Sequence, residues 1–226
     1  MSDFTFSEHG EDILIHRLLL WKENGFYVDV GCYHPRNMSM TPRLRNFGWN
    51  GINIDADERV IKRFNTELPH LTNLCVAITD KNCDVVLRRY EDSVINTISQ
   101  KQKNHLDNIE KNDGLFTKQL DESTVEAKSL TTILDSFEIE QIDFLNLDIE
   151  EMELEALRGF PFDKYLPSVI ACEIHRLILG NSDENEVVHF LMEQGYILQS
   201  YVFHTAIFIR KNFDTELCHR VQAKRL

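Results

Sequence analysis

The 226-residue chain carries 24 basic and 37 acidic side chains, which gives a net charge of −13. This negative charge argues against a nucleic-acid backbone or an anionic membrane surface as a partner, and no stretch is long and apolar enough to span a bilayer. The cysteines at positions 32, 75, 83, 172 and 218 form no Cys-x-x-Cys pair, which is typical of reduced thiols. We therefore expect one cytoplasmic domain over residues 1–226, without a membrane segment or a nucleic-acid partner.

The first half of the chain predicts strands and helices in alternation. Apolar residues at helical spacing indicate helices, and short β-branched or aromatic runs indicate buried strands. The expected elements are a helix at 8–21, a strand at 26–30 (FYVDV), a short helix entered at Pro42 with Ser39 or Thr41 as N-cap, a strand at 51–55 (GINID), a helix at 57–68 and a strand at 73–78 (NLCVAI). This order predicts a parallel sheet.

The second half adds an interruption and then returns to the same alternation. Residues 100–121 are polar and nearly free of large apolar side chains, so they form a surface helix, a mobile lid or both. The other expected elements are short strands at 84–90 and 123–130, helices at 131–137, 150–159 and 183–194, strands at 142–149 and 169–174, and a hairpin of 196–202 with 205–210. The prediction is an α/β fold with a mostly parallel sheet and a C-terminal antiparallel hairpin.

Acidic residues follow the first two strands. Asp29 and Gly31 close the first strand, and Asp55 ends the second. An Asp-x-Gly turn alone is common, but a second strand ending in an acid about 20 residues later is the spacing that places a carboxylate on ribose hydroxyls. This edge of the sheet is therefore expected to bind a nucleotide-like ligand. His34 lies beside it and either contacts the substrate or supports the turn before Pro35.

A second polar cluster follows the strands at 142–149 and 169–174. Asp148 and Glu150 come after the first of these strands, and Glu173 and His175 after the second. If the strands are neighbours, their side chains meet at the edge that holds Asp29. The cluster is either a general base with its partners or a set of oxygen and nitrogen ligands for a divalent metal, and the spacing leaves both open.

Six motifs in order resemble the FkbM family of S-adenosylmethionine (SAM)-dependent methyltransferases over roughly residues 7–210. They are SEHGED (7–12), GFYVDVGCYHP (25–35), SMT (39–41), GWNGINIDAD (48–57), IDFLNLDIE (142–150) and VIACEIH (169–175). The resemblance implies a class I methyltransferase (Rossmann-like) fold with a seven-stranded sheet. It also implies SAM across the carboxyl ends of the first strands and, usually, O-methylation of a glycan, nucleotide sugar or glycosylated metabolite.

The resemblance also assigns roles to residues. Asp29 and Gly31 would line the methionine part of SAM, Asp55 would hold the ribose hydroxyls, and Asp148 would lie near the methyl group. The cofactor-binding set that follows is Asp29, Gly31, Cys32, Asp55, Ala56, Ala77 and Ile78. We expect a small-molecule or glycan acceptor and a homodimer.

A sugar hydroxyl needs a base or a metal to become a nucleophile at neutral pH. The catalytic candidates are Asp148, His175 and Glu173, which are also the candidate metal ligands, and His34 and Glu150 are the substrate-binding candidates.

The chain departs from the family pattern at three positions. Glu8 stands where the family usually has glutamine, Met40 where it has asparagine, and Glu151 where it has glycine. The changes at Met40 and Glu151 leave a SAM-binding or purely structural relative without catalysis as an alternative. A nucleotide-dependent oxidoreductase is a second alternative, although the three-glycine turn and the Tyr-x-x-x-Lys motif are both missing from the sequence.

Overall fold

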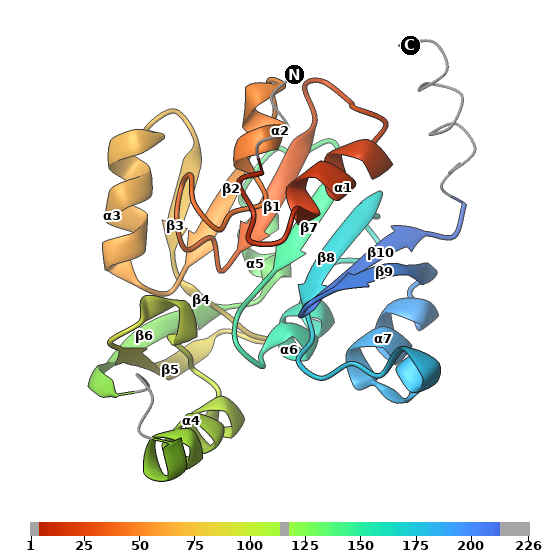
Figure 1. The fold of residues 1–226 in the computed structure, drawn as a ribbon. Helices are drawn as coiled ribbons and strands as arrows, with labels where there is room; N and C mark the ends of the chain where they lie inside the picture. Colours follow the sequence, from red (N-terminus) through yellow and green to blue (C-terminus); the bar gives the residue numbers. More distant parts are fainter. Residues whose placement is uncertain (1–4, 114–117, 213–226) are drawn as a thin grey trace.

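The computed structural model describes residues 5–113 and 118–212 (Figure 1). The helices are α1 (Glu11–Leu18), α2 (Pro42–Asn46), α3 (Glu58–Glu67), α4 (Gln100–Asp113), α5 (Leu130–Leu134), α6 (Glu153–Arg158) and α7 (Glu186–Glu193), with 3₁₀ turns η1 (Ser93–Ile95) and η2 (Leu179–Glu184). The strands are β1 (Phe26–Val30), β2 (Asn50–Asp55), β3 (Thr72–Cys75), β4 (Ala77–Ile78), β5 (Cys83–Tyr90), β6 (Gln119–Lys128), β7 (Phe144–Leu147), β8 (Val169–Glu173), β9 (Tyr196–Val202) and β10 (Thr205–Arg210).

Seven of these strands form the main sheet, in the order β3-β2-β1-β7-β8-β10-β9. The pairs among β3, β2, β1, β7 and β8 are parallel, whereas β10 is antiparallel to both β8 and β9. The strand order reverses at β1, because β2 and β3 lie on one side of it and β7 and β8 on the other. These five parallel strands end at the same edge of the sheet. The expected class I methyltransferase fold, with its mostly parallel sheet and terminal hairpin, is confirmed.

The strand expected at 73–78 is divided between two sheets. β3 pairs with β2 as far as the partners Asp55 and Cys75. Because β2 ends at Asp55, the chain has no further partner there, and Ala77 pairs instead with Ala127 of β6. The second sheet has the order β4-β6-β5. Figure 1 shows it beside the main sheet, with α4 packed next to it.

The strands expected at 84–90 and 123–130 are the long strands of this second sheet, where β5 and β6 pair in antiparallel fashion. The polar segment 100–121 contains helix α4 and the first residues of β6. Residues 114–117 lie outside the described residues. Among the side chains of α4 that the structure describes, Leu106 and Gln102 are buried, so the helix lies on the surface and is anchored by these two residues.

Alternate residues of the main-sheet strands enter two apolar cores, as the two-residue period of a strand requires. On one face, α5, α6 and α7 cover Val28, Leu145 and Ile170. On the other face, α1 and α2 cover Tyr27 and Phe144 (Figure 1). Both faces of the strands are buried, which explains their nearly continuous apolar sequences.

Two cysteines of the main sheet differ in burial. Cys172 is buried in the inner strand β8, but Cys75 is exposed, because β3 is an edge strand of the main sheet. The four described cysteines are free thiols. In the described residues, no helix combines the length and apolar character that crossing a bilayer requires.

A buried ion pair holds the N-terminal segment on the sheet. Arg43 of α2 donates from Nε to Asp12 Oδ2 at 2.8 Å, and the Asp12 carboxylate also accepts from Thr5 Oγ1 at 2.6 Å and Ser7 Oγ at 2.9 Å. Burial opposes ionisation of Asp12, but these hydrogen bonds outweigh it and lower its pKa. The ion pair therefore fixes residues 5–12, which reach the cavity described below.

Replacing Asp12 by alanine leaves the Arg43 guanidinium buried without its carboxylate, so we expect a loss of about 3–5 kcal/mol in the free energy of unfolding. Asp135→Ala is the control, because its ion pair with Lys164 is exposed and should contribute less than about 1 kcal/mol. Urea denaturation at neutral pH measures both. Similar losses in the two variants would contradict the anchoring role.

The sign of the pH dependence follows from the lowered pKa. The stabilisation is fully present above the unfolded-state pKa of about 3.9 and is lost as the pH falls through the lower folded-state value. The difference in the free energy of unfolding between wild type and Asp12→Ala should therefore stay constant near neutral pH and shrink below about pH 4.

Candidate active site

A cavity opens at the carboxyl ends of β1, β2, β7 and β8. Its wall includes ten of the residues expected from the sequence, namely Asp29, Gly31, Cys32, Asp55, Ala56, Ala77, Ile78, Asp148, Glu150 and Glu173. Parts of segments 8–11, 38–40, 93–98 and 203–205 complete the wall. The expected nucleotide-like half and the expected acidic half thus belong to one cavity.

Asp29 is a buried carboxylate of the cavity wall. Asn146 of the neighbouring strand donates from Nδ2 to its Oδ1 at 2.9 Å, and Thr41 donates from Oγ1 to its Oδ2 at 3.2 Å. Burial raises the pKa of Asp29, while the bond from Asn146 and the charge of Arg45 oppose that rise. The side chain is therefore held in one orientation from two sides.

Thr41 occupies the N-cap position of α2, as one of the two sequence alternatives predicts, but its hydroxyl makes no capping hydrogen bond. Instead it accepts from Arg45 Nη1 at 2.6 Å and donates to Asp29. Asn146 is missing from the sequence-based set of site residues. A polar side chain in the middle of the apolar run FLNL is the signal that could have identified it.

Gly31 is the point of closest approach between the first strand and the acidic half. Its φ is +78°, and a Cβ at this position would overlap the backbone oxygen of Asp148. Only glycine fits, because the position requires both left-handed backbone and close backbone contact. The loop after β1 and the loop after β7 therefore lie directly against each other.

Asp55 ends β2 on the cavity wall. Its carboxylate accepts from the backbone N–H of Tyr33 at 3.3 Å and of Asp57 at 2.8 Å. Burial raises its pKa to about 7, although both backbone donors favour the charged form. These donors orient the carboxylate at the place where the sequence predicts ribose hydroxyls.

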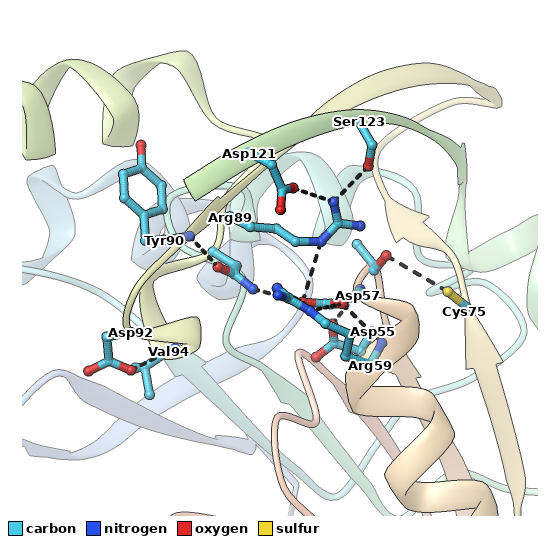
Figure 2. A network of polar contacts seen from close by, with 12 residues as sticks. Asp55, Asp57, Arg59, Cys75, Arg89, Tyr90, Asp92, Val94, Asp121 and Ser123 are labelled. Carbon is cyan, nitrogen blue, oxygen red and sulfur yellow. Dashed lines mark hydrogen bonds and ion pairs between the residues drawn. The ribbon is translucent and has the colours of Figure 1, made fainter. Parts of the chain in front are cut away.

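Asp57, two residues later, ties the second sheet to the end of β2 (Figure 2). Its Oδ1 accepts from the N–H of Arg59 at 3.0 Å and so caps α3. Its Oδ2 accepts from Nδ2 of Asn96 at 3.0 Å and lies 3.5 Å from Nε of Arg89. Arg89 also donates from Nη1 to Asp121 Oδ1 at 2.9 Å. Burial opposes ionisation of Asp57, but the bonds from Arg59 outweigh it and lower the pKa.

This network positions part of the cavity wall. Asn96 belongs to the segment 93–98, most of which faces the cavity, whereas the described residues of α4 do not reach it. The wall segment 93–98 therefore precedes the polar region 100–121, for which a mobile lid is one of the sequence-based alternatives. The N-cap role of Asp57 can be predicted from its position, but its contacts with Arg89 and Asn96 depend on the fold.

The acidic half contains a pair of carboxyl groups. The side chain of Asp148 is exposed to the cavity, and its carboxyl lies next to that of Glu173. Desolvation by the protein around the cavity, and then repulsion from the nearby carboxylates, Glu150 among them, raise the pKa of both groups, that of Glu173 more. The pair therefore holds a shared proton near neutral pH.

His175 lies outside the wall, behind these acids. Its Nε2 lies 3.6 Å from Glu150 Oε2 and 3.4 Å from Glu173 Oε2. The contact with Glu150 raises the pKa of His175. Among the described residues, Glu150, Glu173 and His175 bring one potential ligand atom each to within 4.8 Å of one another. Asp148 of the expected metal set is not in this group.

The turn between β7 and α6 has left-handed backbone at two acidic residues, with φ of +54° at Glu150 and +73° at Glu151. The helix expected at 150–159 therefore begins only at Glu153. Contacts with the segment around α4 hold the turn. Gln102 donates from Nε2 to Glu150 Oε2 at 2.5 Å, and Lys101 forms an ion pair with Glu151.

His34 does not belong to the cavity wall. Its Nδ1 accepts from the backbone N–H of Arg36 at 3.0 Å and of Asn37 at 3.2 Å. These bonds close the turn after Pro35.

We expect Gly31→Ala to unfold at lower urea concentration than Gly195→Ala. Both glycines are left-handed, but a Cβ at Gly195 would meet no atom within 4 Å, so that variant should lose only the backbone term of about 1–2 kcal/mol. Gly31→Ala should lose about 1–3 kcal/mol more of the free energy of unfolding, because the backbone of Asp148 must move away from the added methyl group. Equal losses would contradict the close approach.

Glu151→Gly tests the strain in the turn. Glycine relieves the left-handed backbone, worth about 1–2 kcal/mol, but increases the freedom of the unfolded chain and removes an exposed ion pair. We expect a net gain of up to about 1 kcal/mol in urea denaturation. Lys101→Ala removes the ion pair alone and should cost less than about 1 kcal/mol. If Glu151→Gly lost more of the free energy of unfolding than Lys101→Ala, the proposed backbone strain at Glu151 would be ruled out.

Three comparisons relate the chain to known proteins. The family description "Methyltransferase FkbM domain" matches residues 29–198, and no curated protein matches the sequence. Solved structures similar to this chain include methyltransferase FkbM from Methylobacillus flagellatus KT, with 13% identity and a TM-score of 0.48, over 82% of this chain and 43% of that chain.

Two further structures cover most of both chains. One is precorrin-6y C5,15-methyltransferase from Geobacter metallireducens GS-15, with 10% identity, a TM-score of 0.47 and coverage of 91% and 89%. The other is a TehB-like SAM-dependent methyltransferase from Corynebacterium glutamicum ATCC 13032 Kitasato, with 13% identity, a TM-score of 0.41 and coverage of 87% of each chain.

The chain spans less than half the length of the Methylobacillus protein. The family match is more extensive, because residues 29–198 make up about three quarters of the sequence and contain the ten expected residues of the cavity wall. The chain therefore belongs to the FkbM methyltransferase family.

Proposed function

We propose that the protein is a SAM-dependent O-methyltransferase that acts on a hydroxyl group of a sugar-containing acceptor. The observation that carries this proposal is the position of Asp148 and Glu173 on the wall of the cavity that Asp29 and Asp55 also line. The raised pKa of Asp148 suits proton transfer near neutral pH. Membership in a methyltransferase family favours this function over the nucleotide-dependent oxidoreductase.

The first half of the cavity fits SAM. Gly31 lets the loop after β1 lie against the loop after β7, and Asp55 presents an oriented carboxylate at the end of β2. Ala77 and Ile78 add an apolar wall suited to a purine. When bound, SAM supplies an electrophilic methyl group on a positively charged sulfur, and the carboxylates of this cavity favour that charge.

Asp148 is the proposed general base. It faces the cavity, and its pKa of about 7 matches a base that works near neutral pH. Glu173 would retain the shared proton, so that Asp148 is the member of the pair that accepts the proton of the acceptor hydroxyl. His175 is a positioning residue, because it contacts Glu150 and Glu173 without belonging to the wall.

A divalent cation is a second way to activate a hydroxyl. Glu150, Glu173 and His175 supply hard oxygen and nitrogen ligands in the described part of the cavity region. Turnover that survives EDTA would assign activation to Asp148 alone.

The proposal is tested with methyl-labelled SAM and a panel of methyl glycosides and oligosaccharides, with mass spectrometry to detect transfer. Wild type should label a hydroxyl, and Asp148→Asn should lower kcat about 10²–10⁴-fold while SAM affinity stays nearly unchanged. Asp163→Asn, an exposed site away from the cavity, is the control. SAM binding without transfer to any acceptor would favour the inactive relative suggested by Met40 and Glu151.

The pH profile gives an independent readout. A base must be deprotonated to act, and the pKa of Asp148 is raised to about 7, so kcat should rise with pH through that value. His175→Ala should lower kcat and shift this profile, because the imidazolium beside Glu150 and Glu173 is lost. A profile that is flat from pH 5 to 9, about two pH units either side of that value, would remove Asp148 as the base.

A further inference from the structure

The acceptor half and the cofactor half of the cavity are formed by different strands and loops. Gly31, Asp55 and Ala77 come from the first strands of the sheet. The opposite side consists of the N-terminal segment 8–11, residues 38–40 and the β9–β10 turn, together with the acids that follow β7 and β8. This second side is where an acceptor would lie next to Asp148.

The charged groups of this side are mainly carboxylic. They are Glu8, Glu11, Asp148, Glu150 and Glu173, with the imidazoles of His9 and His204. No lysine or arginine belongs to the cavity wall within residues 5–113 and 118–212. The nearby cations already have acidic partners, since Arg43 pairs with Asp12 and Lys101 with Glu151. His175, when protonated, pairs with Glu150 and Glu173 from outside the wall.

The two histidines do not offset these acids. His9 lies within 3.5 Å of Glu11 and 3.9 Å of Glu8, so its positive form would be neutralised locally. Repulsion from Glu150 already contributes to the raised pKa values of Asp148 and Glu173. A phosphate or carboxylate entering here would add another like charge in surroundings of low dielectric constant.

The mouth offers uncharged contacts in place of cations. The ring of Phe203 stacks on that of His9, with centroids 3.8 Å apart and planes inclined by 27°. Phe203 is 67% exposed and Met38 is 44% exposed, and both belong to the wall. Exposed aromatic and thioether groups beside a few polar ones are typical of sites for small, uncharged ligand parts.

We propose that the acceptor brings no anionic group into the cavity. Its reacting part is a neutral or amine-bearing saccharide of a glycan or glycosylated metabolite, and not a nucleotide sugar, a sugar phosphate or a uronic acid. This inference rests on the proposed function and narrows its acceptor class.

The experiment uses sets of acceptors that share one parent sugar and differ only in charge: the methyl glycoside, its 2-amino derivative, its 6-phosphate and its uronic acid. Saturation-transfer NMR on the protein with S-adenosylhomocysteine measures binding, and labelled SAM measures kcat/KM. The neutral and amine-bearing members should bind and react, and the anionic members should show at least about 100-fold lower kcat/KM.

Glu8→Lys places a cation at the mouth, where the Glu8 side chain is 61% exposed. This variant should reduce the kcat/KM ratio between the neutral and the anionic members at least about threefold. A higher salt concentration should reduce the same ratio in wild type. Glu58→Lys, on the exposed first turn of α3 and outside the cavity wall, is the charge-matched control and should leave the difference unchanged.

The two readouts separate this inference from the proposed function. Selective binding of the neutral and amine-bearing members without methyl transfer supports the inference and contradicts the O-methyltransferase proposal. Anionic members that bind or react as well as their neutral partners overturn the inference and leave the O-methyltransferase proposal intact. If no saccharide binds in any set, the inference is also wrong.

Discussion

The contact between Gly31 and the backbone of Asp148 is the constraint on which the site depends. It joins the loop after β1, where the cofactor is expected, to the loop after β7, which carries the proposed base. The Asn146–Asp29 hydrogen bond holds the same two strands together one step deeper in the sheet. Because both contacts span neighbouring parallel strands, the distance between the two halves of the cavity is set by the sheet itself.

A second feature of the site is an accumulation of carboxyl groups that the fold only partly compensates. Asp12 and Asp57, at the borders of the cavity, have arginine partners and lowered pKa values. Asp148 and Glu173, inside it, have raised values and each other as neighbours. Groups of the first kind stabilise the folded chain, whereas groups of the second kind remain available for proton transfer and for a positively charged ligand.

Much of this arrangement could be predicted from local sequence patterns. Short apolar runs ending in acids identified the strand ends, and hence Asp29, Asp55 and Asp148, because parallel strands place their carboxyl ends at one edge. The features that local patterns did not predict depend on contacts between residues distant in sequence. The division of residues 73–78 between two sheets follows from where β2 ends, the Asp57–Arg89 contact follows from the second sheet, and the left-handed turn at Glu151 is a position where the side chain gives no local signal.

The most direct test of this account is calorimetric titration of SAM and S-adenosylhomocysteine into wild type and Asp55→Ala, with Mg²⁺ or with EDTA. The account predicts micromolar binding of both ligands to wild type and clearly weaker binding to Asp55→Ala, since that variant lacks the carboxylate held by the N–H groups of Tyr33 and Asp57. Absence of binding to wild type, or equal binding to the variant, would contradict the assignment of this cavity to SAM.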